Sequence, residues 1–193
     1  MKCAPCIEKE CSKGKDCFNN KDEIKAKYSP RELKMMLAAD KLTEKYYMKK
    51  TRIEEVIYFA KEMKYKRLGM AFCIGLRQEA EILDRILSRD FKVFSANCKI
   101  CGIKKSEMRP GTKVSEKKVR ISCNPIGQAE TLNQKKTDLN INLGLCLGHD
   151  ILFTEHSRAP VTTLAVKDRV LGHNPLGAIY SRFYRLKRFN LDQ

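Results

Sequence analysis

Cysteines are the residues of this sequence best suited to chemistry, and the chain of 193 residues contains nine of them. In a reducing compartment, this many thiols indicate metal ligation or redox chemistry more than structural disulfides. The odd count leaves at least one cysteine outside any complete pairing. The positions of the cysteines divide most of them into two sets, which predict two sites.

The first set has the pattern C-x2-C-x4-C-x5-C at the start of the chain, at Cys3, Cys6, Cys11 and Cys17. A zinc ribbon normally joins two C-x2-C knuckles across a dozen or more residues, whereas tight runs such as this one are typical of iron–sulfur clusters. The opening C-x2-C-x4-C is similar to the start of a motif found in several four-iron–four-sulfur domains, although the last interval differs. We therefore expect a metal centre here, with a 4Fe–4S cluster favoured over zinc.

The second set follows predicted strands. The segment Leu139–Asp150 alternates apolar residues with asparagine, glycine and cysteine, which is typical of a strand with one apolar face. Short strands are also expected at 68–73 and 91–97. Each of the three strands reaches a cysteine, and a fourth cysteine stands just before a helix that Asn124 and Pro125 begin. These four residues are Cys73, Cys98, Cys146 and Cys123.

Sites in an open parallel sheet form outside the carboxyl ends of the strands, beside helix N-termini. We therefore expect Cys73, Cys98, Cys123 and Cys146 to share one edge and to bind a cofactor there, as a second metal or thiol site. The alternative is that they are small apolar fillers, because cysteine is among the most buried residue types. Cys101 forms a C-x2-C pair with Cys98, but its place in a basic loop makes it a weaker candidate.

Four side chains expected near the same edge are candidates for catalysis: His149, Asp150, Lys167 and His173. A lone histidine is more often structural than catalytic, so each histidine alone is weak evidence. Lys167 and Arg169 can hold a small anionic substrate or balance the charge of a cluster. The sequence has no G-x-S-x-G elbow, no G-x-G-x-x-G and no P-loop, so serine hydrolysis and nucleotide binding lack their usual signatures.

Three parts are predicted along the chain: a cysteine-rich metal-binding segment at 1–20, a helical hairpin at 21–66 and an α/β domain at 67–193. The hairpin helices begin at Ser29-Pro30 and at Thr51, where Glu54 completes a capping box.

The remaining chain alternates strands with helices of ten or more residues. That alternation predicts an open, mostly parallel sheet of about four to five strands flanked by helices. A long mobile loop is expected at 99–118, and a last helix at 176–186.

The net charge of +16, from 39 basic and 23 acidic residues, favours anionic partners. Nucleic acid is not the favoured partner, because no aromatic-basic RNA motif is present. The longest apolar run, Leu68–Leu76, is nine residues and too short to span a membrane. The first residues form a charged segment and not an apolar run, so we expect no signal peptide, no membrane contact and a cytoplasmic location.

Several pieces of the sequence resemble a family of small, cysteine-rich prokaryotic proteins, a domain of unknown function whose members are predicted to bind metal. They are C-A-P-C…C-S-K-G-K-D-C at 3–17, A-F-C-I-G-L at 71–76, C-N-P-I at 123–126, T-D-L-N-I…G-L-C-L-G-H-D at 137–150, A-P-V-T-T-L-A-V-K-D-R at 159–169 and G-H-N-P at 172–175. The resemblance covers nearly the whole chain and implies metal binding. Cys101 lies outside the resembling pieces.

The leading hypothesis from the sequence is a cytoplasmic iron–sulfur or zinc protein with a second cysteine site, engaged in electron transfer or redox chemistry. An iron–sulfur oxidoreductase is the enzyme class that fits, with a redox protein or a small anionic molecule as partner. Two alternatives stay open: a zinc-stabilised module that binds nucleic acid or an acidic protein, and a carrier that delivers a metal or cluster.

Overall fold

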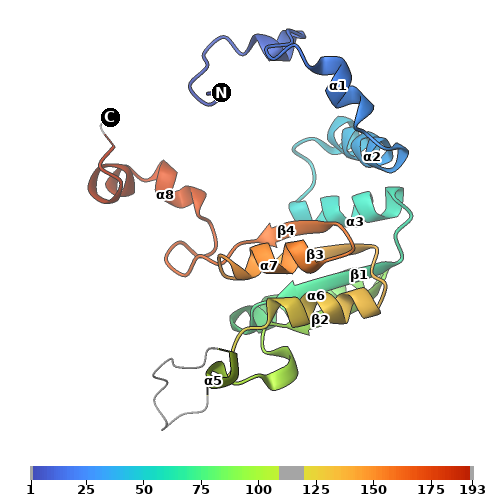
Figure 1. The fold of residues 1–193 in the computed structure, drawn as a ribbon, viewed down its shortest axis with the longest axis vertical. Helices are drawn as coiled ribbons and strands as arrows, with labels where there is room; N and C mark the ends of the chain where they lie inside the picture. The colour runs from blue at the N-terminus through green and yellow to red at the C-terminus, as the bar shows by residue number, and fades with distance from the viewer. Residues whose placement is uncertain (1, 109–119, 192–193) are drawn as a thin grey trace. The chain divides into compact units, whose positions relative to one another are not determined.

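The computed structural model describes residues 2–108 and 120–191. Four parallel strands form one sheet in the order β2-β1-β3-β4 (Figure 1). Their bounds are β1 Arg67–Phe72, β2 Lys92–Asn97, β3 Leu139–Leu143 and β4 Val161–Ala165. The predicted open parallel α/β sheet is therefore confirmed.

Helices cover both faces of this sheet (Figure 1). One apolar cluster joins α3 (Arg52–Glu62) and α4 (Arg77–Leu87) to residues of β1 and β3 that include Met70 and Ile141. A second cluster joins α6 (Pro125–Gln134) and α7 (His149–His156) to the opposite face. In β3 all five residues are buried, as expected for a central strand that is covered on both sides.

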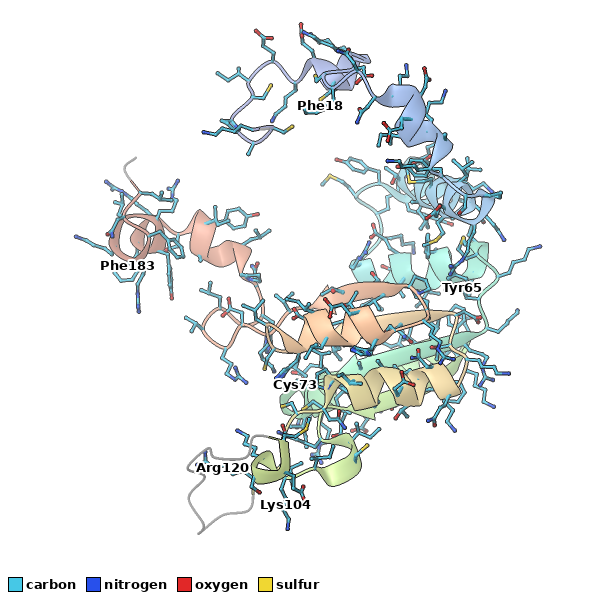
Figure 2. The ribbon with its side chains drawn as sticks, in the orientation of Figure 1. Phe18, Tyr65, Cys73, Lys104, Arg120 and Phe183 are labelled. Carbon is cyan, nitrogen blue, oxygen red and sulfur yellow. The ribbon has the colours of Figure 1, made fainter. Side chains whose placement is uncertain are left out.

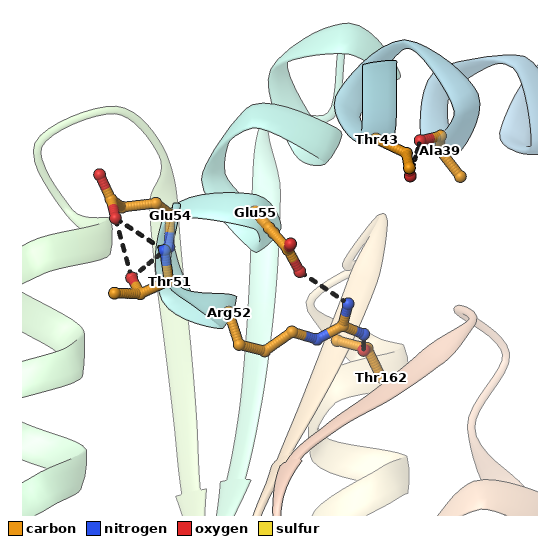
Figure 3. Close-up of polar contacts among 7 residues, drawn as sticks. All are labelled: Ala39, Thr43, Thr51, Arg52, Glu54, Glu55 and Thr162. Atoms are coloured by element: carbon orange, nitrogen blue, oxygen red, sulfur yellow. Dashed lines mark hydrogen bonds and ion pairs between the residues drawn. The ribbon is translucent and has the colours of Figure 1, made fainter. Parts of the chain in front are cut away.

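Side-chain caps begin three of the helices, as their sequences predict. Ser29 with Glu32 forms a complete capping box at the start of α2 (Pro30–Tyr46). Thr51 with Glu54 forms another at the start of α3 (Figure 3). Asn124 accepts a hydrogen bond from the amide of Gly127 at the start of α6. These caps satisfy amide groups that the first helical turn leaves without backbone partners.

The chain divides into two compact units, residues 1–49 and residues 50–193. The first unit contains the 3-10 helix η1 (Glu10–Lys13), α1 (Lys21–Ala26) and α2, and Ala38 is its one buried residue among those described. The two helices expected at 21–66 are α2 and α3, which belong to different units. The three-part division at residues 20 and 66 stays a prediction.

The ends of several elements differ from the expectation. β3 stops at Leu143 because Gly144 turns the chain with φ 65°. The expected last helix is two short elements, α8 (Leu176–Tyr180) and the π-helix η4 (Tyr184–Arg188).

The predicted loop at 99–118 contains η3 (Ile100–Gly102) and α5 (Lys105–Met108), and its residues 109–118 lie outside the described ones. One further 3-10 turn, η2 (Ile74–Leu76), follows β1. Among the helices of the described residues, none is long and apolar enough to cross a membrane.

Candidate thiol site at the sheet edge

The carboxyl ends of β1 and β2 place two cysteines next to each other. Phe72 and Asn97, the last residues of these strands, are register partners, and Cys73 and Cys98 follow them directly. Figure 2 shows Cys73 just beyond the end of its strand. Adjacent parallel strands are about 4.8 Å apart, so thiols at neighbouring tips can meet.

A third cysteine joins them through the start of α6. The amide of Asn124 donates to the carbonyl of Cys98 at 2.9 Å, which holds Cys123 beside the tip of β2. The Cys98 thiol lies close enough to the thiols of Cys73 and Cys123 for both of them to affect its pKa. It also accepts the amide of Ile74 at 3.4 Å. Three of the four cysteines predicted at this edge therefore lie together, with Cys98 in the middle.

The surroundings push the pKa values of two of these thiols in opposite directions. Burial raises the pKa of Cys98 to about 11, and the neighbouring thiols Cys123 and Cys73 act in the same direction. Burial also opposes ionisation of Cys73, but the amide of Gly75 and the ammonium of Lys167 outweigh it and lower the pKa of Cys73. A nearby cation and a backbone donor therefore stabilise the thiolate form of Cys73.

Cationic side chains accompany three of the four predicted cysteines. The ammonium of Lys167 is near enough to Cys73 to lower the pKa of its thiol. Lys99 Nζ lies 3.3 Å from Cys123 Sγ and 2.9 Å from the carbonyl oxygen of Ile121. Arg169 Nη2 lies 3.8 Å from Cys146 Sγ. Two segments of the chain, the one after β2 and the one after β4, therefore supply positive charge to this edge of the sheet.

Cys146 occupies a place of its own. Because Gly144 ends β3 early, Cys146 lies in the turn before α7, where its carbonyl oxygen accepts the amides of His149 and Asp150 at 2.9 and 3.1 Å. The contact recorded for its thiol is the one with Arg169. The structure places Cys146 at the expected edge but links it to none of the other three thiols.

The four predicted catalytic candidates have different surroundings. Lys167 lies at the thiol group, whereas His149 and Asp150 begin α7. Nδ1 of His173 accepts the amide of Asp168 at 3.1 Å and lies 3.2 Å from the carbonyl oxygen of Val166. These contacts hold the turn after β4, so they favour a structural role for His173.

The cysteines of the N-terminal pattern are all exposed, and so is Cys101. Cys11 lies in η1, and left-handed backbone at Lys9 and Gly14 bounds this short turn. Across residues 2–108 and 120–191, no three cysteine, histidine, aspartate or glutamate side chains are grouped as a metal ion would need. Metal binding by Cys3, Cys6, Cys11 and Cys17 stays a prediction.

Two residues that support the site were not anticipated. The position of Lys99 directly after Cys98 is the one feature of the sequence that indicates a role for Lys99 at this site. Gln128 is fully buried, and its Nε2 donates to the carbonyl oxygens of Phe72 and Ala96 at 3.2 and 2.7 Å. It therefore ties α6 to the ends of β1 and β2. The sequence signal for Gln128 was its position as a polar residue one helical turn after the capping residue Asn124.

The comparisons with known proteins agree with the resemblance found in the sequence. Residues 12–164 match the family described as "Protein of unknown function (DUF1847)". The chain belongs to the DUF1847 family. A protein of Methanocaldococcus jannaschii, described as uncharacterized, is 51% identical over 189 residues, which is 97% of each chain. No solved structure matches. The matched range contains all four predicted sheet-edge cysteines, whereas Cys3, Cys6 and Cys11 precede it.

Proposed function

We propose that this DUF1847 protein performs thiol–disulfide redox chemistry at the group formed by Cys73, Cys98 and Cys123. The observation that carries the proposal is the central position of Cys98, whose pKa is affected by both other thiols. Two thiols this close can form a disulfide once one of them has reacted. The remaining thiol provides a second partner for exchange.

Cys73 is the residue suited to attack. Its thiolate attacks one sulfur of a disulfide substrate, the S–S bond of the substrate breaks, and the departing sulfur leaves as a thiolate. The result is a mixed disulfide between Cys73 and the other half of the substrate. Lys167 and the Gly75 amide support the thiolate that begins this step.

Cys98 is the residue suited to resolve the mixed disulfide. Its proton passes to the departed substrate thiolate, and its sulfur then attacks Sγ of Cys73, which releases the second substrate thiolate. The protein ends with a Cys73–Cys98 disulfide, and the substrate has gained two electrons. A high pKa at Cys98 fits a thiol that stays protonated until the mixed disulfide has formed.

Trapping the intermediate tests this order. The Cys98→Ser variant should hold a stable mixed disulfide at Cys73 after treatment with oxidised glutathione, whereas Cys73→Ser should hold none at this group. Peptide mapping of the oxidised wild type should show a Cys73–Cys98 disulfide. Cys101→Ser is the matched control, because Cys101 is exposed and belongs to neither predicted set. Equal reaction of exposed cysteines without any Cys73–Cys98 disulfide would refute the proposal.

A second candidate function is metal binding by the N-terminal cysteines. One buried residue among the described residues of the first unit is too little apolar core to hold about fifty residues in one conformation. A metal or cluster bound by thiolates supplies folding free energy to such small units. The four thiols at Cys3, Cys6, Cys11 and Cys17 are a chemically suitable donor set, and a 4Fe–4S cluster would supply electrons one at a time.

Metal analysis of an anaerobic preparation tests this second function. Iron with inorganic sulfide and visible absorption would support an iron–sulfur protein, and both should be lost in Cys11→Ser but kept in Cys101→Ser. Loss in Cys146→Ser as well would instead support metal at the sheet edge. Colourless protein with zinc alone would remove the electron-transfer version. Salt-sensitive nucleic-acid binding by that zinc form would then favour the binding-module alternative.

A cytoplasmic location is part of the proposal, because thiol redox chemistry of this kind depends on a compartment that keeps cysteines reduced. None of the nine cysteines is joined in a disulfide in the structure.

A further inference from the structure

Cys123 takes no part in the two exchange steps between Cys73 and Cys98, although it belongs to the same group of thiols. Those steps leave a Cys73–Cys98 disulfide with little access to solvent, because Cys73 is 9% exposed and Cys98 is 3% exposed. Cys123 is more exposed than either of them. Since thiol–disulfide exchange depends on access to the sulfur, Cys123 is the member of the group that a large external thiol reaches most readily.

Backbone hydrogen bonds hold Cys123 next to Cys98. The amide of Asn124 donates to the carbonyl oxygen of Cys98 at 2.9 Å, and Asn124 Nδ2 donates to the carbonyl oxygen of Ile100 at 3.4 Å. These two bonds join the segment that begins at Cys123 to the segment that begins at Cys98. Backbones joined in this way are close enough for a disulfide, which spans about 4.4–6.8 Å between Cα atoms.

The side chain of Lys99 fixes the thiol itself. Lys99 Nζ donates to Cys123 Sγ at 3.3 Å and to the carbonyl oxygen of Ile121 at 2.9 Å. Because Lys99 directly follows Cys98 in the chain, this contact links the Cys123 thiol to the tip of β2. The effect of Cys123 on the pKa of Cys98 agrees with that placement. Cys98 therefore has a second neighbour with which it can form a disulfide.

We propose that Cys123 takes over the disulfide from Cys73 and presents it to an external dithiol, which reduces the protein. The proposal rests on the proposed function, because it begins with the Cys73–Cys98 disulfide. The thiolate of Cys123 attacks Sγ of Cys98, the Cys73–Cys98 bond breaks, and Cys73 leaves as a thiolate. One S–S bond replaces another, so this step consumes no oxidant or reductant. Cys73 is then free to react with the next substrate.

The surroundings of the thiols favour this direction of transfer. Exchange is faster when the departing sulfur is a stable thiolate, and the Gly75 amide and Lys167 stabilise the thiolate of Cys73. The dithiol then attacks Sγ of Cys123, and the Cys98–Cys123 bond breaks. Cys98 regains a proton as it leaves, which fits its high pKa. The second thiol of the reductant releases Cys123, so the reductant becomes a disulfide and has lost two electrons.

Quenched peptide mapping of the full-length protein tests the order of the two disulfides. Trypsin separates the cysteines concerned, because a lysine or arginine lies between each of them and the next in the sequence. Oxidised glutathione starts the reaction, and N-ethylmaleimide stops it at intervals. The wild type should show the Cys73–Cys98 disulfide first and the Cys98–Cys123 disulfide after a lag. In Cys73→Ser, the Cys98–Cys123 disulfide should form at least about tenfold more slowly.

The mapping distinguishes failure of the proposed function from failure of the role of Cys123. An absence of both disulfides would refute the proposed function and this role together. A Cys73–Cys98 disulfide that forms without any later Cys98–Cys123 disulfide would overturn the role of Cys123 alone. The same conclusion would follow if the Cys98–Cys123 disulfide formed equally fast in Cys73→Ser, since Cys123 would then react with the oxidant directly.

Reduction of the oxidised protein provides a second measurement, with reduced thioredoxin as the dithiol. In Cys123→Ser the disulfide cannot move away from Cys73, so reduction should be at least about tenfold slower than in the wild type. Cys101→Ser is the matched control, because Cys101 is exposed and forms a C-x2-C pair with Cys98, and its reduction should match that of the wild type. Equal rates in the wild type and Cys123→Ser would overturn the proposal, and slow reduction of Cys101→Ser alone would assign the role to Cys101 instead.

Discussion

The ammonium of Lys167 lies near the thiol of Cys73, although strand β3 separates the two strands that these residues follow. Lys167 follows β4 and Cys73 follows β1, yet the sheet order places β3 between them. Two glycines border the Lys167 ammonium: a Cβ built at Gly144 would lie 3.9 Å from Lys167 Nζ, and one at Gly75 would lie 3.6 Å from it, both ordinary contact distances. The tip of β3 is thus a neighbour of the thiol site.

Removing the cation should slow the reaction of Cys73. Burial alone would raise the pKa of this thiol, and Lys167 with the Gly75 amide reverses the direction. Lys167→Met should therefore raise the pKa of Cys73, so that less thiolate is present at neutral pH and alkylation of Cys73 by iodoacetamide slows by about tenfold per pKa unit. Mass spectrometry of the labelled peptide at several pH values measures this.

Lys66→Met provides the matched control for that experiment, because Lys66 is exposed and stands just before β1, at the opposite end of the strand. Its alkylation profile should follow that of the wild type. A Cys73 profile unchanged in Lys167→Met would show that Lys167 does not support the thiolate.

Gly144→Ala should destabilise the protein. Gly144 has φ 65°, and a Cβ there would lie 2.0 Å from Cδ1 of Leu76, a buried core residue. Backbone strain and a clash in the core each cost about 1–3 kcal/mol in unfolding free energy. Gly172→Ala separates the two causes, because Gly172 has φ 58° with no heavy atom within 4 Å of its Cβ position. Denaturant unfolding should show a larger loss for Gly144→Ala, and equal losses would remove the clash as a cause.

The sequence was informative wherever local patterns determine the structure. Alternating apolar residues predicted the strand from Leu139, and capping residues predicted the helix starts at Ser29, Thr51 and Asn124, because these signals depend on neighbours along the chain. The placement of Cys73 beside Cys98 also followed from local signals, since each cysteine directly follows a strand and parallel strands end at the same edge.

Contacts between residues that are distant in the sequence could not be predicted from such local patterns. Cys146 was expected to join the other thiols, but the left-handed turn at Gly144 redirects the chain before it, and the thiol contacts Arg169 instead. The contacts of Lys99 and Gln128 depend on which element packs beside which, and nothing in the residues around them specifies that.

Gln128→Met should weaken the support beneath the thiols. The substitution keeps the length of the side chain but removes the donor to the carbonyl oxygens of Phe72 and Ala96. Loss of buried hydrogen bonds of this kind costs about 1–3 kcal/mol, although Oε1 of Gln128 has no partner and its removal offsets part of the cost. Denaturant unfolding measures the change. Gln134→Met, at the exposed end of α6, should be close to wild type.

The capping box of α3 should make stability depend on acidic pH. Glu54 accepts a hydrogen bond from Lys50. It also accepts the amide and hydroxyl of Thr51 (Figure 3), and together these contacts lower its pKa from 4.5 to about 2. A carboxyl with a lowered folded-state pKa stabilises the fold above its unfolded pKa, and this stabilisation is lost as pH falls toward the folded value. The contribution of Glu54 should therefore be complete at neutral pH and decline between pH 4.5 and about 2.

Thermal unfolding of wild type and Glu54→Gln across this range tests the pH dependence. Glutamine cannot ionise, so the melting temperature of Glu54→Gln should be lower than that of the wild type at neutral pH, and the two should converge as pH falls toward 2. Glu79→Gln, an exposed position in α4, serves as the control and should keep a constant offset. A difference between wild type and Glu54→Gln that stays the same at every pH would mean that the charge of Glu54 does not stabilise the start of α3.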